Sequence, residues 1–160
     1  MKYIALVLAM ICILAGCTAE PTWETMKDEL DQPAVHQEHE VVMDTSASLL
    51  SMESEWGRIY LYEGFDVCIQ IQESGDLGRT LQTVTGFQRD ELMLVETSGG
   101  DFQRFDCAWS AMSADGQMVG RTILFDDGVH HYCITMTTQA DHMAEVEDAW
   151  LGLITSIRIV

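Results

Sequence analysis

The residues of this chain best suited to bind a metal lie near position 130. His130, His131 and Cys133 follow the dipeptide Asp127-Gly128. On a β-strand, His131 and Cys133 point to the same face, because side chains alternate with a period of two. An imidazole and a thiolate both suit zinc or copper. The alternative, which we favour, is that His131 is a buried, hydrogen-bonded side chain and Cys133 a small core residue.

A second pair of histidines lies closer to the N-terminus. His36 and His39 flank Gln37-Glu38, with Glu40 beyond. An i, i+3 pair on a helix can share one face and chelate a metal. This stretch is polar and we expect it to be mobile. We therefore predict no metal site here, and no cofactor for the chain.

Motifs of known catalytic sites are absent from the sequence. It contains no nucleophile elbow, phosphate loop, dinucleotide fingerprint or zinc-protease motif. Asp126-Asp127-Gly128 lacks the alternating acidic ligands and the closing Glu of a calcium-binding EF-hand loop, and a hairpin turn explains these residues. We therefore predict no catalytic residues and a protein that is not an enzyme.

Cys17 indicates a different chemistry, which is covalent lipidation. Lys2 precedes an unbroken apolar run over residues 4–15. This run is shorter than the ~20 residues of a membrane-spanning helix and fits the core of a signal peptide. It ends in Leu14-Ala15-Gly16-Cys17, which matches the bacterial lipobox, where the cysteine is lipidated and the peptide is cut before it. We predict a signal peptide over residues 1–16 and a lipid on Cys17, which stably anchors the protein to the extracytoplasmic face of the cell membrane. The alternative is an ordinary secreted protein.

The charge of the chain limits its partners. The 160 residues include 26 acidic and eight basic side chains, which gives a formal net charge of −18. Such a surface repels nucleic acid and anionic lipid headgroups, so we expect neither as a partner and membrane contact only through the lipid. It favours cations or basic partners weakly and in a salt-dependent way.

The composition along the chain predicts a tether followed by one domain. Residues 17–40 are polar and acidic and hold both prolines, as expected for a tether. Within it, Trp23, Met26 and Leu30 have helical spacing. Residues 41–160 have a globular pattern and suffice for a single domain with its own core.

Much of the first half of the domain has strand character. Residues 65–72 alternate apolar and polar side chains, which predicts a strand with one apolar face. Further strand candidates are residues 41–43, 48–52, 58–62 and 91–97.

The second half predicts a three-stranded antiparallel meander. Its strands are residues 102–113, 117–126 and 129–138, joined at Asp115-Gly116 and Asp127-Gly128. Asp-Gly suits a tight hairpin turn, because both central positions need positive φ.

Two helices complete the predicted fold. One covers residues 74–86, with Asp76 as its N-cap and Gly86 as its end. The other covers residues 141–156, and we interpret Trp150 as a core anchor rather than a ligand platform. Its buried stripe comprises Met143, Val146, Trp150, Leu153, Ile154 and Ile157. The order of elements predicts an α+β fold, an antiparallel sheet packed by two helices.

The cysteines after Cys17 are Cys68, Cys107 and Cys133. If both Asp-Gly pairs form two-residue loops, Cys107 faces Leu124 and Cys133 faces Thr122. The two cysteines then share one face but lie on strands about 9.6 Å apart, beyond the ~7 Å that a disulfide spans. We predict that they are not bonded to each other. The pattern does not place Cys68 against either.

Several local motifs resemble known families. The lipobox, Trp23-Glu24-Thr25, and Asp126-Asp127-Gly128 followed by Tyr132-Cys133 are similar to segments of small lipoproteins from anaerobic gut bacteria, as is Gly86-Phe87-Gln88-Arg89 with Glu91-Leu92. The ending, Trp150 with Ile154-Thr155-Ser156-Ile157, resembles the last helix of PsbP-like domains. That resemblance implies an α/β/α sandwich around an antiparallel sheet, and a domain that binds partner proteins and is not an enzyme. It assigns no site residue.

Three functions compete at this point. The first is a non-enzymatic surface lipoprotein that binds or assembles with a protein or small ligand outside the cell. The second is an extracytoplasmic metal-handling protein that uses His131 and Cys133. The third, a hydrolase with an unrecognised site, has no residue in its favour. We predict the first and keep the second as the alternative.

Overall fold

The computed structural model describes residues 37–160, and the structural statements below concern this part of the chain. The predicted signal peptide over residues 1–16, the predicted lipidation site Cys17, the stripe at Trp23 and His36 lie outside the described residues. Within residues 37–160, no helix has both the length and the apolar character that crossing a membrane requires.

Seven strands form one antiparallel sheet with the spatial order β2-β3-β4-β8-β7-β6-β5. The predicted meander lies between β4 and β5, and its strands β6, β7 and β8 are neighbours in that order. The strands are β2 (Leu50–Ser54), β3 (Gly57–Tyr62), β4 (Phe65–Glu73), β5 (Val95–Gly99), β6 (Phe102–Ser113), β7 (Gly116–Asp126) and β8 (His130–Gln139). Two short strands, β1 (Val41–Val42) and β9 (Arg158–Ile159), pair separately.

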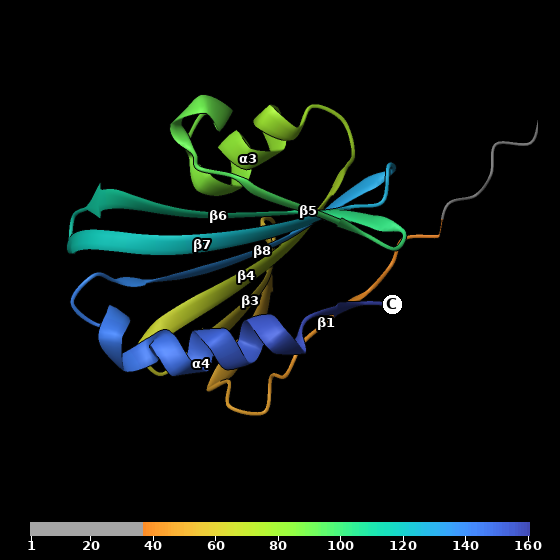
Figure 1. Ribbon diagram of the computed structural model, residues 1–160. Coiled ribbons are helices and arrows are strands. Elements are labelled where there is room, and N and C mark those ends of the chain that lie inside the picture. The colour runs from red at the N-terminus through yellow and green to blue at the C-terminus, as the bar shows by residue number, and fades with distance from the viewer. Residues whose placement is uncertain (1–36) are drawn as a thin grey trace, which may run out of the picture. The chain divides into compact units, whose positions relative to one another are not determined.

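Two helices cover the two faces of this sheet, as Figure 1 shows. Helix α3 (Leu77–Thr85) and the 3₁₀ turn η1 (Arg89–Glu91) lie on one face, and helix α4 (Met143–Ser156) lies on the other. The predicted α+β class, an antiparallel sheet between two helices, is confirmed.

Each face of the sheet has its own core, because successive side chains of a strand point to opposite sides. In the central strand β8, Tyr132, Ile134 and Met136 face α4, whereas His131 and Cys133 face α3. The run from His131 to Met136 is therefore buried throughout. The core on the α4 side comprises Val41, Met43, Tyr62, Phe65, Val67, Ile69, Ile123, Tyr132, Ile134, Met136, Val146, Trp150, Leu153 and Ile157. The smaller core on the α3 side comprises Leu81, Leu92, Phe105, Cys107, Leu124 and Cys133.

Helix α3 begins and ends at the residues predicted from its sequence. The carboxylate of Asp76 accepts a hydrogen bond from the backbone N–H of Gly78 at 2.9 Å. Gly86 closes the helix with φ 82°, a left-handed conformation that favours glycine. On α4, Trp150 is only 4% exposed and belongs to the core, as predicted.

The predicted pairing of the β6–β7 hairpin is wrong by two residues. Ser113 pairs with Gly116 around the loop Ala114-Asp115, so Cys107 faces Thr122 rather than Leu124. The Ser113 hydroxyl donates to the carbonyl of Gly116 and accepts from the N–H of Asp115. These bonds fix a Ser-x-x-Gly turn in which Gly116 is the first residue of β7.

The β7–β8 hairpin is also shifted by two residues. Asp126 pairs with His131, and Cys133 therefore faces Leu124 rather than Thr122. The Asp126 and Asp127 carboxylates accept hydrogen bonds from backbone N–H groups of the turn. These bonds stabilise a four-residue loop, residues 127–130, in place of the predicted two-residue loop.

The shift is even in both hairpins, so every side chain keeps its predicted face. Cys107 and Cys133 lie on the same face with β7 between them, and both are free, as is Cys68. Cys68 lies on this face too, beside Thr135.

Strand β5 begins four residues later than predicted. Residues 89–91 form η1, and the next residue, Leu92, is buried in the core under α3. As a result, β5 pairs with β6 only between Val95 and Gly99, and Val95 is opposite Asp106. The rest of β6, Cys107–Ser113, extends past the end of β5.

Candidate functional site

His131 and Cys133 lie on one face of β8, as predicted, but beneath α3 and away from solvent. His131 Nδ1 is 2.8 Å from the Thr80 hydroxyl, and its Nε2 is 3.3 Å from the Ser74 hydroxyl. Burial, with smaller contributions from Cys68 and Cys107, raises the pKa of Cys133 to about 12. Because the thiolate is the metal ligand, this protonated thiol is poorly prepared to bind one. His131 is a hydrogen-bonded core side chain, as we favoured.

Ser74, Asp126 and His131 form a cluster that the sequence did not suggest. The Ser74 hydroxyl donates to Asp126 at 3.0 Å, and Asp126 lies 3.5 Å from His131 Nε2. In a catalytic triad, the serine and the carboxylate contact opposite nitrogens of the imidazole. Here both face Nε2, and Nδ1 faces Thr80. The cluster therefore has the residue types of a triad without its geometry.

Of the second histidine pair, only His39 lies among the described residues, and it packs against aromatic rings. His39, in the segment expected to be mobile, packs edge-on against Phe102 and Tyr132, with ring centroids 5.3 and 6.1 Å away. Its backbone N–H donates to the Tyr132 hydroxyl. From Gln37 to Val160, no three His, Cys, Asp or Glu side chains are grouped as metal ligands would be.

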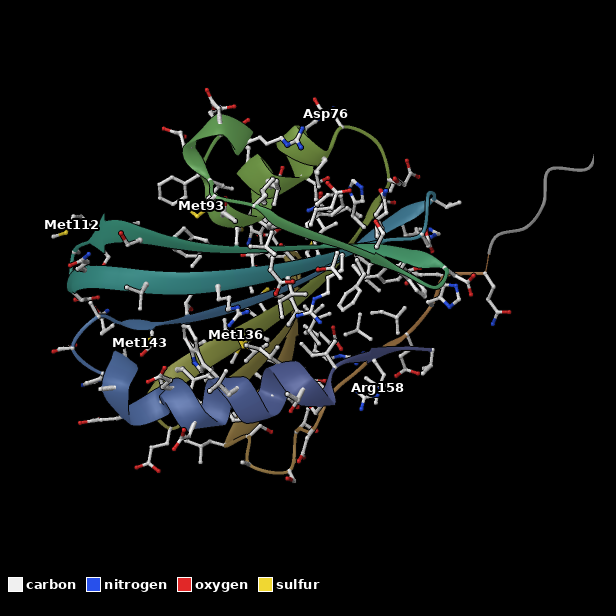
Figure 2. The ribbon with its side chains drawn as sticks, in the orientation of Figure 1. Asp76, Met93, Met112, Met136, Met143 and Arg158 are labelled. Atoms are coloured by element: carbon white, nitrogen blue, oxygen red, sulfur yellow. The ribbon has the colours of Figure 1, made fainter. Side chains whose placement is uncertain are left out.

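A groove of about 890 Å³ runs along the part of β6 that extends past β5. We call it the edge groove, and its floor is the free edge of β6 from Cys107 to Ser110. On the α3 side its wall contains Phe87, Leu92 and Met93, and on the α4 side Met143, Trp150, Leu151 and Ile154. Figure 2 shows Met93 and Met143 on opposite sides of the sheet, and Met112 at the hairpin end of β6.

The apolar side chains around the edge groove are unusually accessible. Met93 is 84% exposed and Leu151 is 50% exposed, and Val95 and Met112 are exposed as well. Scattered apolar residues are normal on a surface, but a contiguous group marks an interaction site. Met93, Val95 and Leu151 line the edge groove, and Met112 lies farther along the same strand, β6.

Trp109 gives the α3 side of the groove a fixed shape. Its ring lies across β7 at Gly120, where an added Cβ would come within 2.3 Å of the indole. Its N–H donates to the Thr122 hydroxyl at 3.1 Å, and Phe87 packs on it at 5.9 Å between ring centroids. The absence of a side chain at Gly120 therefore lets Trp109 lie flat in the wall.

The charges of the groove lie around it and not on its floor. The segment Cys107–Ser113 contains no charged residue. Asp106 pairs with Val95, the first residue of β5. Its carboxylate forms salt bridges with Arg104 at 2.7 Å and with Arg121 at 3.4 Å. Glu91 and Glu147 line the groove on the α3 and α4 sides and are exposed. The edge groove is thus mainly apolar, with the paired Asp106 and Arg121 in its lining and a glutamate at each of its two sides.

One buried donor in the groove wall lacks a partner. The indole N–H of Trp150 makes no hydrogen bond within the described part of the chain, although the residue is 4% exposed. A buried N–H without an acceptor is uncommon and destabilising.

Trp150 belongs to the core, as predicted, but the groove that it also lines was not predicted. The groove exists because β5 is shorter than β6, and β5 was predicted at residues 91–97. No specific sequence signal marks the groove, since the uncharged run Cys107–Ser113 is shorter than the uncharged run over residues 129–140.

Comparisons with known proteins identify the fold. No family model and no curated protein matches the sequence. Among solved structures, the chain is similar to cyanobacterial PsbP (CyanoP) from Synechocystis, with a TM-score of 0.54 and 10% identity over 80% of this chain and 96% of that one. It is similar to LpqN of Mycobacterium tuberculosis, described as involved in cell envelope biogenesis, with a TM-score of 0.53 and 12% identity over 79% and 87%. A Bacteroides thetaiotaomicron protein matches with a TM-score of 0.51 and 11% identity over 75% of this chain and 45% of its own. The fold is PsbP-like.

Proposed function

We propose that this protein is a membrane-anchored extracytoplasmic lipoprotein whose domain is a non-enzymatic binding or assembly module. The observation that carries the proposal is the edge groove, an uncharged free strand edge between two apolar walls. Residues that could catalyse a reaction, such as the half-buried Ser74 and the buried His131, are hydrogen-bonded to other side chains. The groove offers contact area, and its partner is a protein outside the cell.

The anchoring part of the proposal is supported by the lipobox at Cys17. A domain tethered through a lipid keeps its groove at a bounded distance from the membrane, where surface proteins are its available partners. The similarity to LpqN, described as involved in cell envelope biogenesis, agrees with such a location.

Site-specific photo-crosslinking in intact cells tests this function. A photoreactive amino acid replaces Leu151 at the groove, and Leu50 on β2 in a matched control, since these leucines are 50% and 52% exposed. We expect a discrete cross-linked product from position 151 and none from position 50. Equal labelling at both positions, or no product from position 151, would contradict the proposal.

The alternative, a metal-handling protein that uses His131 and Cys133, has less support, because both side chains are fully buried under α3. Thermal unfolding of the full chain with zinc or with a chelator separates the two. A ligand that binds only the folded state raises the melting temperature. A marked rise with zinc, lost in Cys133→Ala, would favour the alternative.

A further inference from the structure

We infer that the edge groove binds an extended segment of its partner protein, which pairs with β6 as an additional strand and carries apolar side chains flanked by basic residues. This inference rests on the proposed function and specifies the partner's chemistry. Strand addition to a free sheet edge is a common mode of peptide recognition, in which main-chain hydrogen bonds give affinity and side-chain pockets give specificity.

The backbone of β6 offers hydrogen bonds along the groove. Both hairpins that contain β6 close on two-residue loops, at the pairs Ser113–Gly116 and Gly99–Phe102. The closing pair of such a loop is hydrogen-bonded, and bonded pairs then alternate along the ladder. Even-numbered residues of β6 therefore direct their N–H and C=O groups away from β7. Beyond β5, these residues are Ala108, Ser110 and Met112.

The two walls determine which side chains the segment carries. Side chains of an added strand alternate between the two faces of the sheet. On one face they would contact Phe87 and Met93, and on the other Met143, Leu151 and Ile154. Apart from the Asp106–Arg121 ion pair, both walls are mainly apolar. We therefore expect about five consecutive apolar residues in the segment, without the polar alternation of a surface strand.

The charge of the protein favours a basic partner over a second copy of the chain. Glu91 and Glu147 border the groove on its two sides, so lysines or arginines that flank the apolar residues would meet them. Two copies joined through β6 would bring four such carboxylates together, in chains of formal charge −18. Like charges placed together in an interface are unfavourable.

The other edge of the sheet shows how an edge is protected. Strand β2 also has exposed apolar residues, Leu50 and Met52. However, Glu53 lies on this strand and Glu55 follows it in the turn. Charged side chains on edge strands oppose pairing with another chain. The segment Cys107–Ser113 has no such charge.

The test uses the full chain in lipid nanodiscs and a synthetic peptide, Lys-Lys-Val-Leu-Val-Phe-Val-Lys-Lys. Binding is followed by amide hydrogen exchange. We expect exchange to slow about tenfold or more at Ala108, Ser110 and Met112 and to stay unchanged on β2. Two further peptides carry N-methyl groups on alternate backbone nitrogens, one on the odd-numbered and the other on the even-numbered residues. An added strand forms hydrogen bonds to its neighbour only through alternate residues. We therefore expect one of the two peptides to lose binding and the other to keep it.

Matched proline variants test the same edge from the protein side. Ser110 and Ser51 each direct their N–H away from the neighbouring strand, so proline removes no ladder hydrogen bond at either position and is tolerated on an edge. Ser110→Pro is expected to weaken peptide binding about tenfold or more, and Ser51→Pro to leave it unchanged. Circular dichroism of each variant checks folding, and the N-methylated peptides probe the unmodified protein if Ser110→Pro does not fold.

Several outcomes would overturn the inference. These are no binding at about 1 mM peptide, equal binding of both N-methylated peptides, or protection at β2 instead of β6. Self-association of the chain that Ser110→Pro abolishes would make a second copy the occupant. If the peptide pairs with β6 but Leu151 yields no cross-linked partner in cells, the proposed function fails and strand pairing stands. If Leu151 cross-links a protein while the peptides show no pairing, the function stands and the inference fails.

Discussion

At the scale of single residues, Asp127 is the side chain that holds the β7–β8 turn. It accepts hydrogen bonds from the backbone N–H groups of Val129 and His130 and from the Tyr132 hydroxyl. Burial alone would raise the pKa of Asp127, but these hydrogen bonds outweigh it and lower the pKa below its usual value. A carboxylate with a lowered pKa in the folded state stabilises the protein above its unfolded-state pKa.

We expect Asp127→Ala to lower the free energy of unfolding by about 1–3 kcal/mol at neutral pH. The stabilisation from this carboxylate is present above about pH 4 and is lost as the pH falls through the lowered folded-state pKa. The difference between wild type and variant should therefore shrink in acid, as measured by denaturant unfolding at several pH values. Asp115→Ala is the control, since Asp115 also precedes a turn glycine but is exposed. An equal effect of both substitutions would contradict this role of Asp127.

The three cysteines of the domain should differ in reactivity. Cys107 and Cys133 are buried and Cys68 is partly exposed. Burial raises the pKa of all three thiols, that of Cys133 to about 12. Because the thiolate is the reactive form, iodoacetamide at pH 8 should modify Cys68 first and the other two only after unfolding. Peptide mapping measures the order, and a linked Cys107–Cys133 peptide in unreduced protein would show that the strand order is wrong.

Single residues were predictable where their role is local. Asp76, Gly86 and Trp150 have the positions expected from helix caps and helical spacing. The cluster of Ser74, Asp126 and His131 was not predictable, because its members come from the ends of β4, β7 and β8. Only the pairing of these strands brings them together.

At the scale of the strands, two hairpins share a Ser-x-x-Gly turn. In the β2–β3 hairpin, the Ser54 hydroxyl donates to the carbonyl of Gly57, and Ser113 does the same with Gly116. Gly57 and Gly116 have φ values of 122° and 127°, which residues other than glycine rarely adopt. The turn requires glycine at its fourth position.

Gly57 and Gly128 form a matched pair that separates steric conflict from backbone strain. Both have positive φ, but a Cβ at Gly57 would lie 2.1 Å from the carbonyl oxygen of Ile69, whereas one at Gly128 would meet nothing within 4 Å. We expect Gly128→Ala to cost about 1 kcal/mol and Gly57→Ala more than about 3 kcal/mol, since β3 must move from β4. Denaturant unfolding measures both. Similar losses of unfolding free energy in the two variants would show that the backbone near Gly57 can accommodate a Cβ atom.

The same turns explain why strand faces were predicted correctly and pairing was not. Alternation of apolar residues determines which side chains face the core. The pairing depends on the loop, and Asp115-Gly116 has the composition of a two-residue turn that it does not form. The bonds made by Ser113, Asp126 and Asp127 shift each hairpin by two residues.

At the scale of the whole molecule, we propose that a lipid on Cys17 determines the location of the domain. In Cys17→Ala, we expect either release from the membrane fraction or accumulation of an uncleaved precursor, because no thiol is left to accept the lipid. Cell fractionation and mass spectrometry distinguish these results. Wild-type protein with a free, unlipidated Cys17 would end this interpretation.

The α+β fold could be predicted from the sequence, because strand alternation, the two helices and the meander are each local patterns that agree with one architecture. The edge groove could not, because it arises from a difference in length between two paired strands. Leu92 is buried in the core under α3, so the chain at this residue does not pair with β6. Strand β5 therefore begins only at Val95.

The central claim is that the free edge of β6 is occupied by a partner in the cell. The most direct test is amide hydrogen exchange of the full chain in its native membrane, compared with the purified chain in nanodiscs. Our account predicts slow exchange at Ala108, Ser110 and Met112 in the native membrane and fast exchange after purification, with no such change on β2. Equal rates at these three amides in both preparations would contradict it.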